Sequence, residues 1–259
     1  LGLAMEVIQS KQNPKIKAWK KLATTKGRQK AGQYLIEGTH LVEEALKSGQ
    51  KVRHLVATPD YDLGQLPDQA LSLPLVLVSP ELLKDLSETP TPQGIMAIID
   101  LPSSPLDWQP SGQRYLILDA IQDPGNLGTL IRTADAAAYD GVILGKGTVD
   151  VYNDKVLRAS QGSLWHLEVV SLDLLQEARP AFEAAGIPWF VTALHQGAQA
   201  YQEVPANQKL ALVLGNEGQG VSEAVIQVAD QTIYIPMPGQ AESLNVAVAG
   251  GILMFYFQA

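Results

Sequence analysis

The chain has 259 residues, of which 46% are hydrophobic and 18% charged, a composition that suits two domains of ordinary size and argues against global disorder. It has no cysteine, four histidines without ligand spacing and no apolar run near the roughly 18 residues of a membrane span. We therefore expect no disulfide, no metal and no membrane partner. The formal net charge of −8 by itself argues against a polyanionic partner.

The first 30 residues differ in charge from the rest. They hold eight of the 19 basic residues and one of the 27 acidic ones, for a net charge of +7, which leaves −15 for the remainder. A basic arm on an acidic body suits a protein that brings phosphate groups to one place, although a solvated helix without a partner has the same pattern. Asn13-Pro14 predicts the start of a helix that runs to about Leu22. We expect no signal peptide and a cytoplasmic location.

Short strands and helices alternate between residues 34 and 100. We expect strands at 34–37, 52–58, 74–79 and 94–100, with helices at 39–47 and after Pro80. This alternation predicts a small α/β domain. The Pro- and Ser-rich stretch at 101–113 predicts a linker, and we expect domains at 1–105 and 106–259.

The alternation is more regular after the linker. We expect strands at 114–120, 141–145, 167–170, 188–194, 210–215 and 232–236. Helices are predicted at 126–138, 153–160, 172–185, from about 222, and at 245–257. Near-continuous apolar strands separated by helices predict a mostly parallel sheet that is covered on both faces.

The segment at 119–144 is the first of three in this half that carry polar residues just after a strand. A Pro-Gly-Asn turn leads directly into a helix, whose free N–H groups and positive dipole end suit an anionic or strongly polar ligand. A helix capped by Asn126, with Arg132 on its surface, is the alternative interpretation of this segment taken alone.

The other two segments follow later strands. Residues 212–225 contain a G-x-x-G-x-G turn around Glu217, which is not the dinucleotide fingerprint G-x-G-x-x-G and by itself also fits an ordinary turn. Residues 233–257 run through Pro-Met-Pro-Gly to Ser243 and Asn245, and then into a helix of small residues. That helix is suited to close packing against another backbone, and an N-cap before a buried terminal helix is the alternative.

Taken in this order, the three segments resemble the three motifs of the SpoU (TrmH-type) family of RNA ribose methyltransferases, in the SPOUT superfamily. The matching residues are the Asn-x-Gly and Arg-Thr-Ala of the first motif at 126–128 and 132–134, the Gly-x-Glu-Gly-x-Gly turn at 215–220, and Ile-Pro-Met, Gly and Ser-Leu-Asn-Val at 235–237, 239 and 243–246. The resemblance covers about residues 114–257. More loosely, 32–46 and 92–100 resemble the family's substrate-binding domain.

The resemblance implies both a fold and an activity. The fold is a C-terminal SPOUT-type parallel sheet with a trefoil knot, preceded by a small α/β substrate-binding domain, in a chain that works as a homodimer. The activity is transfer of a methyl group from S-adenosylmethionine to a ribose 2′-hydroxyl of RNA, with a lean toward ribosomal RNA. Ribose methylation of tRNA, methylation of a base, and a non-catalytic RNA-binding protein of the same fold remain alternatives.

The resemblance also implies site residues. The catalytic set is Asn126, Arg132, Glu217, Ser243 and Asn245. The donor-binding set is Leu214, Gly215, Asn216, Gly218, Gly220, Ile235, Met237, Ser243 and Leu244. For RNA binding we expect Arg132 and, from the basic arm, Lys11, Lys15, Lys20, Lys21 and Arg28. Because a guanidinium deprotonates only above about pH 12, we expect Arg132 to hold phosphate and stabilise the developing alkoxide, with phosphate or Glu217 helping with the proton.

Overall fold

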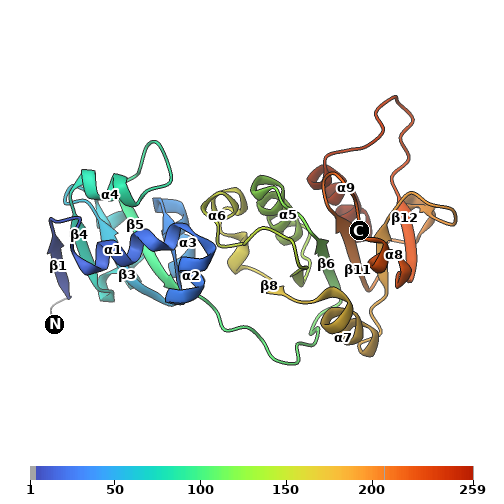
Figure 1. The fold of residues 1–259 in the computed structure, drawn as a ribbon, viewed down its shortest axis with the longest axis horizontal. Coiled ribbons are helices and arrows are strands. Elements are labelled where there is room, and N and C mark those ends of the chain that lie inside the picture. Colours follow the sequence, from blue (N-terminus) through green and yellow to red (C-terminus); the bar gives the residue numbers. More distant parts are fainter. Residues whose placement is uncertain (1–3, 207, 259) are drawn as a thin grey trace. The chain divides into compact units, whose positions relative to one another are not determined.

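The chain folds into two compact units, which Figure 1 shows in a computed structural model that describes residues 4–206 and 208–258. The first unit consists of Leu1–Ser103 with Tyr152–Trp165, and the second of Ser104–Val151 with His166–Ala259. Among the described residues, no helix has the length and apolar character needed to cross a membrane.

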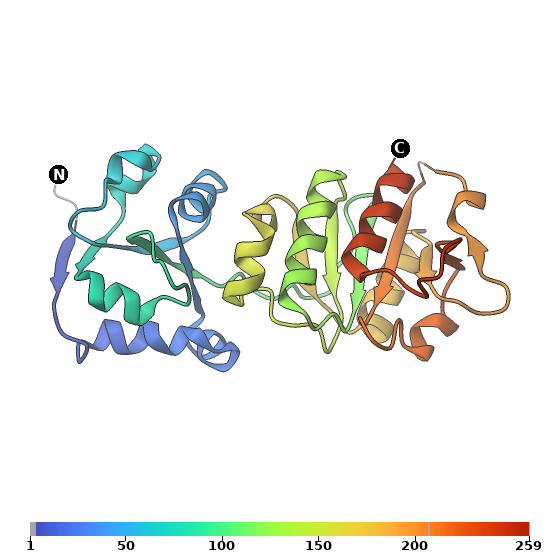
Figure 2. The same cartoon turned by 90° about the horizontal axis from the view of Figure 1, so that it is seen from above.

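A five-stranded sheet forms the centre of the first unit (Figure 2). In the order in which they pair, its strands are β1 (Met5–Ile8), β4 (Leu75–Val78), β3 (Val52–Ala57), β5 (Ile95–Asp100) and β2 (Gln33–Glu37). The first three strands are parallel, and β5 runs antiparallel to both of its neighbours. Strand β1 was not predicted: it is four residues long, and of its side chains only that of Ile8 is buried.

Three of the four helices in the first 103 residues have a short polar side chain as their N-cap. They are α1 (Pro14–Lys20), α2 (Thr25–Ala31), α3 (Thr39–Lys47) and α4 (Pro80–Leu86). Asn13, Thr24 and Ser79 cap α1, α2 and α4, and each side-chain oxygen accepts a hydrogen bond from a backbone N–H that the first helical turn leaves free. Ile16 and Trp19 then fix α1 in the core against the sheet. Helix α2, in which three of seven residues are Lys or Arg, was not predicted.

One helix of the first unit comes from far along the chain. Helix α6 (Asp154–Ser160) follows β7 in sequence, yet the segment 152–165 packs with the first unit. The Tyr152 ring lies 4.5 Å from the Tyr34 ring, and Trp165 Nε1 donates to the Tyr34 hydroxyl at 3.0 Å. The contacts thus divide the chain after Ser103 and assign this segment to the first unit.

The second unit contains a seven-stranded sheet in which every pairing is parallel. Its strands pair in the order β10 (Gln199–Ala200), β12 (Gln231–Tyr234), β9 (Trp189–Thr192), β11 (Leu210–Gly215), β6 (Arg114–Asp119), β7 (Gly141–Leu144) and β8 (Glu168–Ser171). The parallel sheet expected from the near-continuous apolar strands is confirmed. The two-residue β10 was not expected.

Helices cover both faces of this sheet. They are α5 (Pro124–Ala136), α7 (Arg179–Ala184), α8 (Glu223–Gln227) and α9 (Val246–Gln258). Phe182 of α7 and Val225 of α8 share a core cluster with Val213 of β11. Successive strand side chains point to opposite faces, so the neighbouring Leu214 faces α9, where Gly250 brings the helix backbone close to Leu214 and to Leu130 of α5.

A buried tryptophan helps to fix the expected linker to the second unit. The side chain of Trp108 is buried, packs against Tyr115 and Phe182, and donates from Nε1 to Glu168 at 2.9 Å. Leu106, two residues earlier, is 92% exposed. A proline-rich composition alone does not reveal such an anchor, because it depends on a pocket formed by residues far along the chain.

Candidate functional site

The three polar segments meet at one edge of the parallel sheet. Strands β6 and β11 are neighbours, and their final residues, Asp119 and Gly215, pair with each other. The turns that follow these two strands therefore begin side by side, at the carboxyl ends where parallel α/β sheets bind ligands. At this edge Asp119 also accepts a hydrogen bond from Ser222 N at 2.8 Å, just after the glycine-rich turn at 215–220, called the glycine turn below.

Glu217 links the second segment to the first. Its carboxylate accepts hydrogen bonds from Gln122 N at 3.0 Å and from Asp123 N at 2.7 Å. Partial burial raises the pKa of Glu217, but these backbone donors and the Asn126 side chain outweigh burial and leave the pKa below its ordinary value. Glu217 is thus an ionised group that holds the Gln122-Asp123 backbone in place.

The glycine turn has no room for a side chain at its first position. A Cβ on Gly215 would lie 2.1 Å from Gly220 C and Val221 N, both backbone atoms. The turn is closed by two hydrogen bonds between Asn216 and Gly220, and Gly220 has a φ of +73°, which favours glycine. The Asn216 side chain donates to Ala120 O at 2.8 Å, which adds a second link to the first segment.

Asn245 joins the third segment to the first. Its Nδ2 donates to Asn126 Oδ1 at 3.0 Å, and its Oδ1 accepts from Ala247 N at 2.8 Å in the first turn of α9. Asn126 is not the cap of its own helix, because α5 begins at Pro124 and Asp123 accepts from Asn126 N at 2.8 Å. The Asn126 side chain is therefore available to pair with Asn245.

A cavity of about 500 Å³ lies against these turns. All nine residues of the expected donor-binding set line it, including Ser243, which also belongs to the catalytic set. Residues 192–194, at the end of β9, and several apolar residues also line the cavity, and this was not predicted. No recognisable sequence motif follows strand β9. Its place at the cavity follows from its pairing with β11 in the sheet. The additional lining residues are Thr192, Ala193, Leu194, Ile233, Tyr234, Ala241, Glu242, Val246, Ala249 and Leu253, with Glu217 at the edge.

Arg132 lies apart from this group. It is exposed on α5, nearly two turns beyond Asn126, and does not line the cavity. Within the described part of the chain, no hydrogen bond or ion pair joins Arg132 to the cavity. The structure thus groups Asn126, Glu217 and Asn245 through hydrogen bonds and Ser243 through the cavity.

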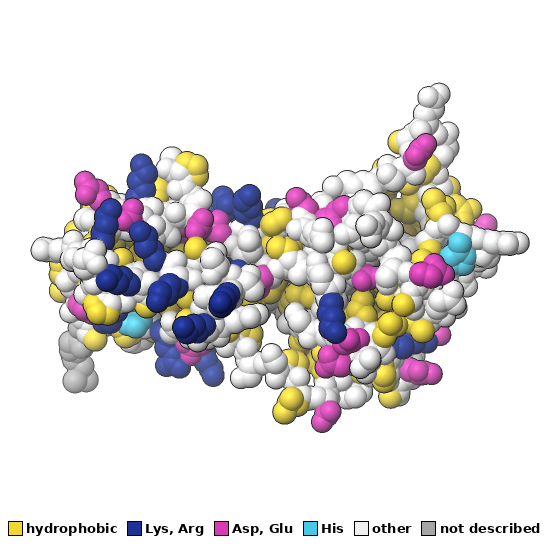
Figure 3. All heavy atoms as spheres, viewed as in Figure 1, with side chains coloured by type: hydrophobic (Ala, Val, Ile, Leu, Met, Phe, Trp, Pro, Cys, Tyr) yellow, Lys and Arg dark blue, Asp and Glu magenta, His cyan; other side chains and the backbone are white. Residues whose placement is uncertain are grey.

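The expected RNA-binding residues of the arm fall into two groups. Lys11 and Lys20 are exposed and lie 2.9 and 3.8 Å from Asp85, Lys15 pairs with Glu6, and Lys21 is exposed. Figure 3 shows basic side chains gathered over the α1–α2 face of the first unit. The expectation of a surface role for Arg28 is corrected by its 4% exposure. Its guanidinium donates to Leu22 O and Thr25 Oγ1, so it supports the α1–α2 turn.

The fold and the cavity together define a class of protein. A parallel α/β sheet with a cavity of this size at the carboxyl ends of its strands, and glycine turns that expose backbone to it, binds a nucleoside-sized ligand. Among the described residues, no cluster of His, Asp and Glu is arranged to hold a metal ion.

Comparisons with known proteins identify the family. Residues 113–255 match the SpoU rRNA Methylase family and residues 13–97 match the MRM3-like substrate binding domain. The chain is 44% identical over 254 residues to the 23S rRNA (guanosine(2553)-2'-O)-methyltransferase RlmP of Bacillus subtilis (strain 168), covering 98% of this chain and 100% of that relative. The chain therefore belongs to the SpoU rRNA methylase family.

Solved structures agree with this assignment. The AdoMet-bound rRNA methyltransferase from Sinorhizobium meliloti is similar with a TM-score of 0.87, at 30% identity and 98% coverage of both chains. The SpoU methyltransferase AviRb from Streptomyces viridochromogenes, in complex with AdoMet, has a TM-score of 0.85 at 29% identity, covering 95% of this chain and 97% of that one. The family and the α/β fold class expected from the motifs are both confirmed.

Proposed function

We propose that this chain transfers a methyl group from S-adenosylmethionine to the 2′-hydroxyl of a ribose in ribosomal RNA. The proposal rests on one observation above all: the nine residues expected to bind the donor line a single cavity, with the Asn126–Asn245 pair and Glu217 at the same sheet edge. In support, the Bacillus subtilis relative is named for 2'-O methylation of a 23S rRNA guanosine, and two similar structures were solved with AdoMet.

The cavity residues fit the donor. Leu214, Ile233 and Leu253 are almost fully buried and form an apolar floor for an adenosine group. Gly215 lets the turn at 215–220 close beside the cavity, because a Cβ there would clash with the backbone of Gly220 and Val221. Ser243 supplies a polar side chain among the same lining residues. When bound, S-adenosylmethionine supplies a methyl group that its sulfonium makes electrophilic.

Alignment of the acceptor is the chain's own contribution to the reaction. The Asn126–Asn245 hydrogen bond fixes the first and third motifs relative to each other. Glu217 already accepts two backbone N–H groups, so we assign it to positioning the first motif. This leaves the substrate phosphate as the acceptor of the hydroxyl proton. Arg132, exposed and permanently charged, binds that phosphate and stabilises the alkoxide as it forms.

We propose a division of labour between the domains at 1–105 and 106–259. The first supplies RNA affinity and the second the methyl-transfer site. The exposed Lys11, Lys20 and Lys21 support this, because phosphate contacts by lysine release counterions and contribute most of the sequence-independent affinity for RNA. The acidic remainder of the chain repels RNA that approaches without this anchor.

A homodimer completes the proposal. Val248, Ile252 and Phe255 recur at helical spacing on α9 and are 53, 36 and 46% exposed, which makes an apolar stripe suited to a second copy of the chain. We also propose the trefoil knot of the family. The chain passes from β12, outside β9, back to α9, which packs against α5 and β11. The bacterial relatives support a cytoplasmic location.

Methyl transfer to isolated RNA tests the function. The purified chain is incubated with radiolabelled donor and with either ribosomal RNA from a strain that lacks the gene or bulk tRNA, and the nucleosides are identified by mass spectrometry after digestion. We expect one 2′-O-methylnucleoside from 23S rRNA. Label confined to tRNA would favour the tRNA alternative, and label on a base would exclude ribose chemistry. Donor binding or RNA binding without transfer would indicate a non-catalytic protein.

A further inference from the structure

A second cavity, of about 350 Å³, lies wholly within the first unit. Its lining comes from four parts of the chain: the α1–α2 region, strand β2, the end of α4 with Glu88, and helix α6 with the residues just before it. Leu22 and Leu86 are buried and Leu35 is half-buried, so its floor is apolar. Its size falls at the lower end of the range of ligand sites, about 300 to 1,000 Å³. The donor site described above uses none of these residues.

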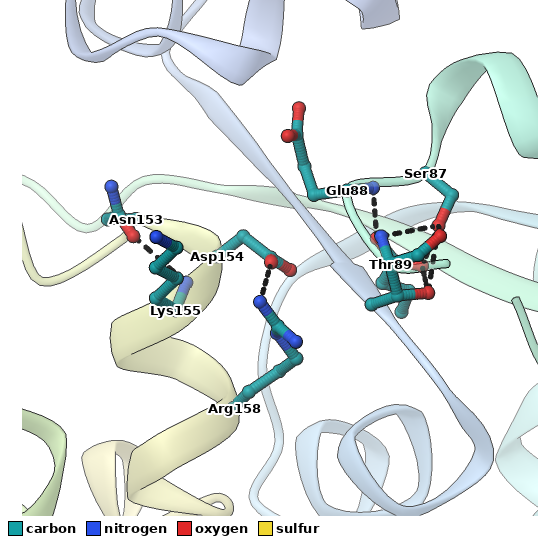
Figure 4. A network of polar contacts seen from close by, with 8 residues as sticks. Ser87, Glu88, Thr89, Asn153, Asp154, Lys155 and Arg158 are labelled. Atoms are coloured by element: carbon teal, nitrogen blue, oxygen red, sulfur yellow. Dashed lines mark hydrogen bonds and ion pairs between the residues drawn. The ribbon is translucent and has the colours of Figure 1, made fainter. Parts of the chain in front are cut away.

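Asp154, on the wall of this cavity, has an incompletely satisfied carboxylate. Its Oδ2 is buried and accepts no hydrogen bond within the described residues, although it lies 2.9 Å from Arg158 Nη2 (Figure 4). Burial raises the pKa of Asp154, and the charges of Glu37 and Glu88 raise it further, against the lowering effect of Arg158. The Asp154 side chain as a whole is 20% exposed, so a ligand with N–H donors can approach its carboxylate from the cavity.

The neighbouring acidic group is different, because it is fully engaged. Glu37 is 7% exposed and accepts from Ser87 Oγ at 2.6 Å, from Glu88 N at 2.9 Å and from Thr89 Oγ1 at 3.3 Å. This network holds the 87–89 segment, and it leaves Glu37 no oxygen to offer a ligand. Of the carboxylates that line the cavity, Asp154 is the one paired with Arg158, and this pair offers a ligand an acceptor next to a donor.

A carboxylate beside a guanidinium matches one nucleobase edge. Guanine presents two adjacent donors, N1–H and the 2-amino group, next to the O6 acceptor. Adenine and cytosine each present one donor beside an acceptor, and uracil presents one donor between two acceptors. Single-stranded RNA is read in this way, by hydrogen bonds to the Watson–Crick edge of a base that is free of stacking.

We propose that this cavity binds an unpaired guanine of the RNA substrate, with the Asp154 carboxylate accepting from N1–H and the 2-amino group and Arg158 donating to O6. The base lies on Leu22, Leu35 and Leu86. Lys20 and Lys155, both exposed and both lining the cavity, bind the flanking phosphates. The inference rests on the proposed RNA substrate, but it concerns recognition and not methyl transfer.

The test measures base preference, not overall affinity. RNA nine-mers of uridine carrying a central guanosine, inosine or adenosine are titrated into the full chain with S-adenosylhomocysteine at saturation, which keeps bases out of the donor cavity. We expect the guanosine nine-mer to bind about ten-fold more tightly than the adenosine one, as for a bidentate base contact. Inosine, which lacks the 2-amino group, falls between them.

Matched variants assign the preference to this cavity. Asp154→Asn removes one of the two charged acceptor oxygens and should reduce the preference to less than about two-fold. Asp60→Asn removes the same charge from the surface of the same unit, outside this cavity, and should leave the preference intact. Ala23→Trp, at an exposed lining position, should block the cavity and abolish the preference without disturbing the core.

The inference is overturned by a wild-type chain without guanosine preference, or by variants at positions 154 and 23 that both retain it. Tighter binding of a lysine-rich peptide than of any nine-mer would assign the cavity to a protein partner and would also overturn it. Donor binding and methyl transfer are assayed separately. A failure here is therefore distinguishable from a failure of the proposed function.

Discussion

Replacing Gly215 by alanine should damage the donor site while a nearby replacement does not. The new Cβ would lie 2.1 Å from two backbone atoms, whereas ordinary contact begins at 3.4 Å, so the Gly220-Val221 backbone must move by about 1.3 Å. Such overpacking costs about 1–3 kcal/mol. The residues from Glu217 to Gly220 are exposed, so the strain is relieved by displacing the turn and not by unfolding β11.

Calorimetric titration with S-adenosylhomocysteine measures the effect. If the displaced turn loses that free energy in binding, Gly215→Ala should bind about 10- to 100-fold more weakly than the wild type. Gly218→Ala is the matched control. Its Cβ would meet nothing closer than 3.6 Å, and it lines the same cavity. Equal affinities for the two variants would refute the reasoning, as would a large fall in Tm for Gly218→Ala alone.

Four further perturbations test the remaining assignments. Arg132→Ala should abolish methyl transfer and leave donor binding within about two-fold, because Arg132 lies outside the cavity; normal turnover would remove it from the reaction. Glu217→Gln should lower Tm relative to the wild type at neutral pH. Because the pKa of Glu217 is depressed in the folded state, this difference in Tm should be complete above about pH 5 and shrink below about pH 4. A difference that grew on acidification would contradict this. Lys20→Gln with Lys21→Gln should flatten the salt dependence of RNA affinity by about one to two units of slope, without changing donor affinity; an unchanged slope would make the arm a solvated helix. Val248→Glu should shift sedimentation to a monomer, whereas Leu71→Glu, an exposed apolar site in the other unit, should not.

The sequence alone could predict the motif turns, because their causes are local. Each turn follows an apolar strand, and glycine or proline marks the turn or the start of a helix. These signals can all be recognised within a few neighbouring residues of the sequence. Strands β6, β11 and β12 therefore fall within a few residues of their expected places, and their order predicts a parallel sheet. The nine donor-binding residues line one cavity because all of them flank these turns.

Tertiary structure alone decided how those turns are held. The bond from Gln122 N to Glu217 spans 95 residues of sequence, and it exists because β6 and β11 pair with Asp119 opposite Gly215. No local sequence pattern encodes that register. The sequence therefore suggested Glu217 as a proton acceptor, whereas in the structure its carboxylate oxygens accept backbone hydrogen bonds.

The same limit explains the two largest departures in the first unit. The sequence predicted Arg28 to be an exposed cation of the basic arm. In the structure Arg28 is buried, and its guanidinium donates to Leu22 O in the segment between α1 and α2. Helix α6 was readable as a helix, yet its membership of the first unit depends on Tyr34 and on the β2 surface, more than 100 residues earlier in the chain. Periodicity determines which face of a helix is apolar; only the assembled chain determines what that face meets.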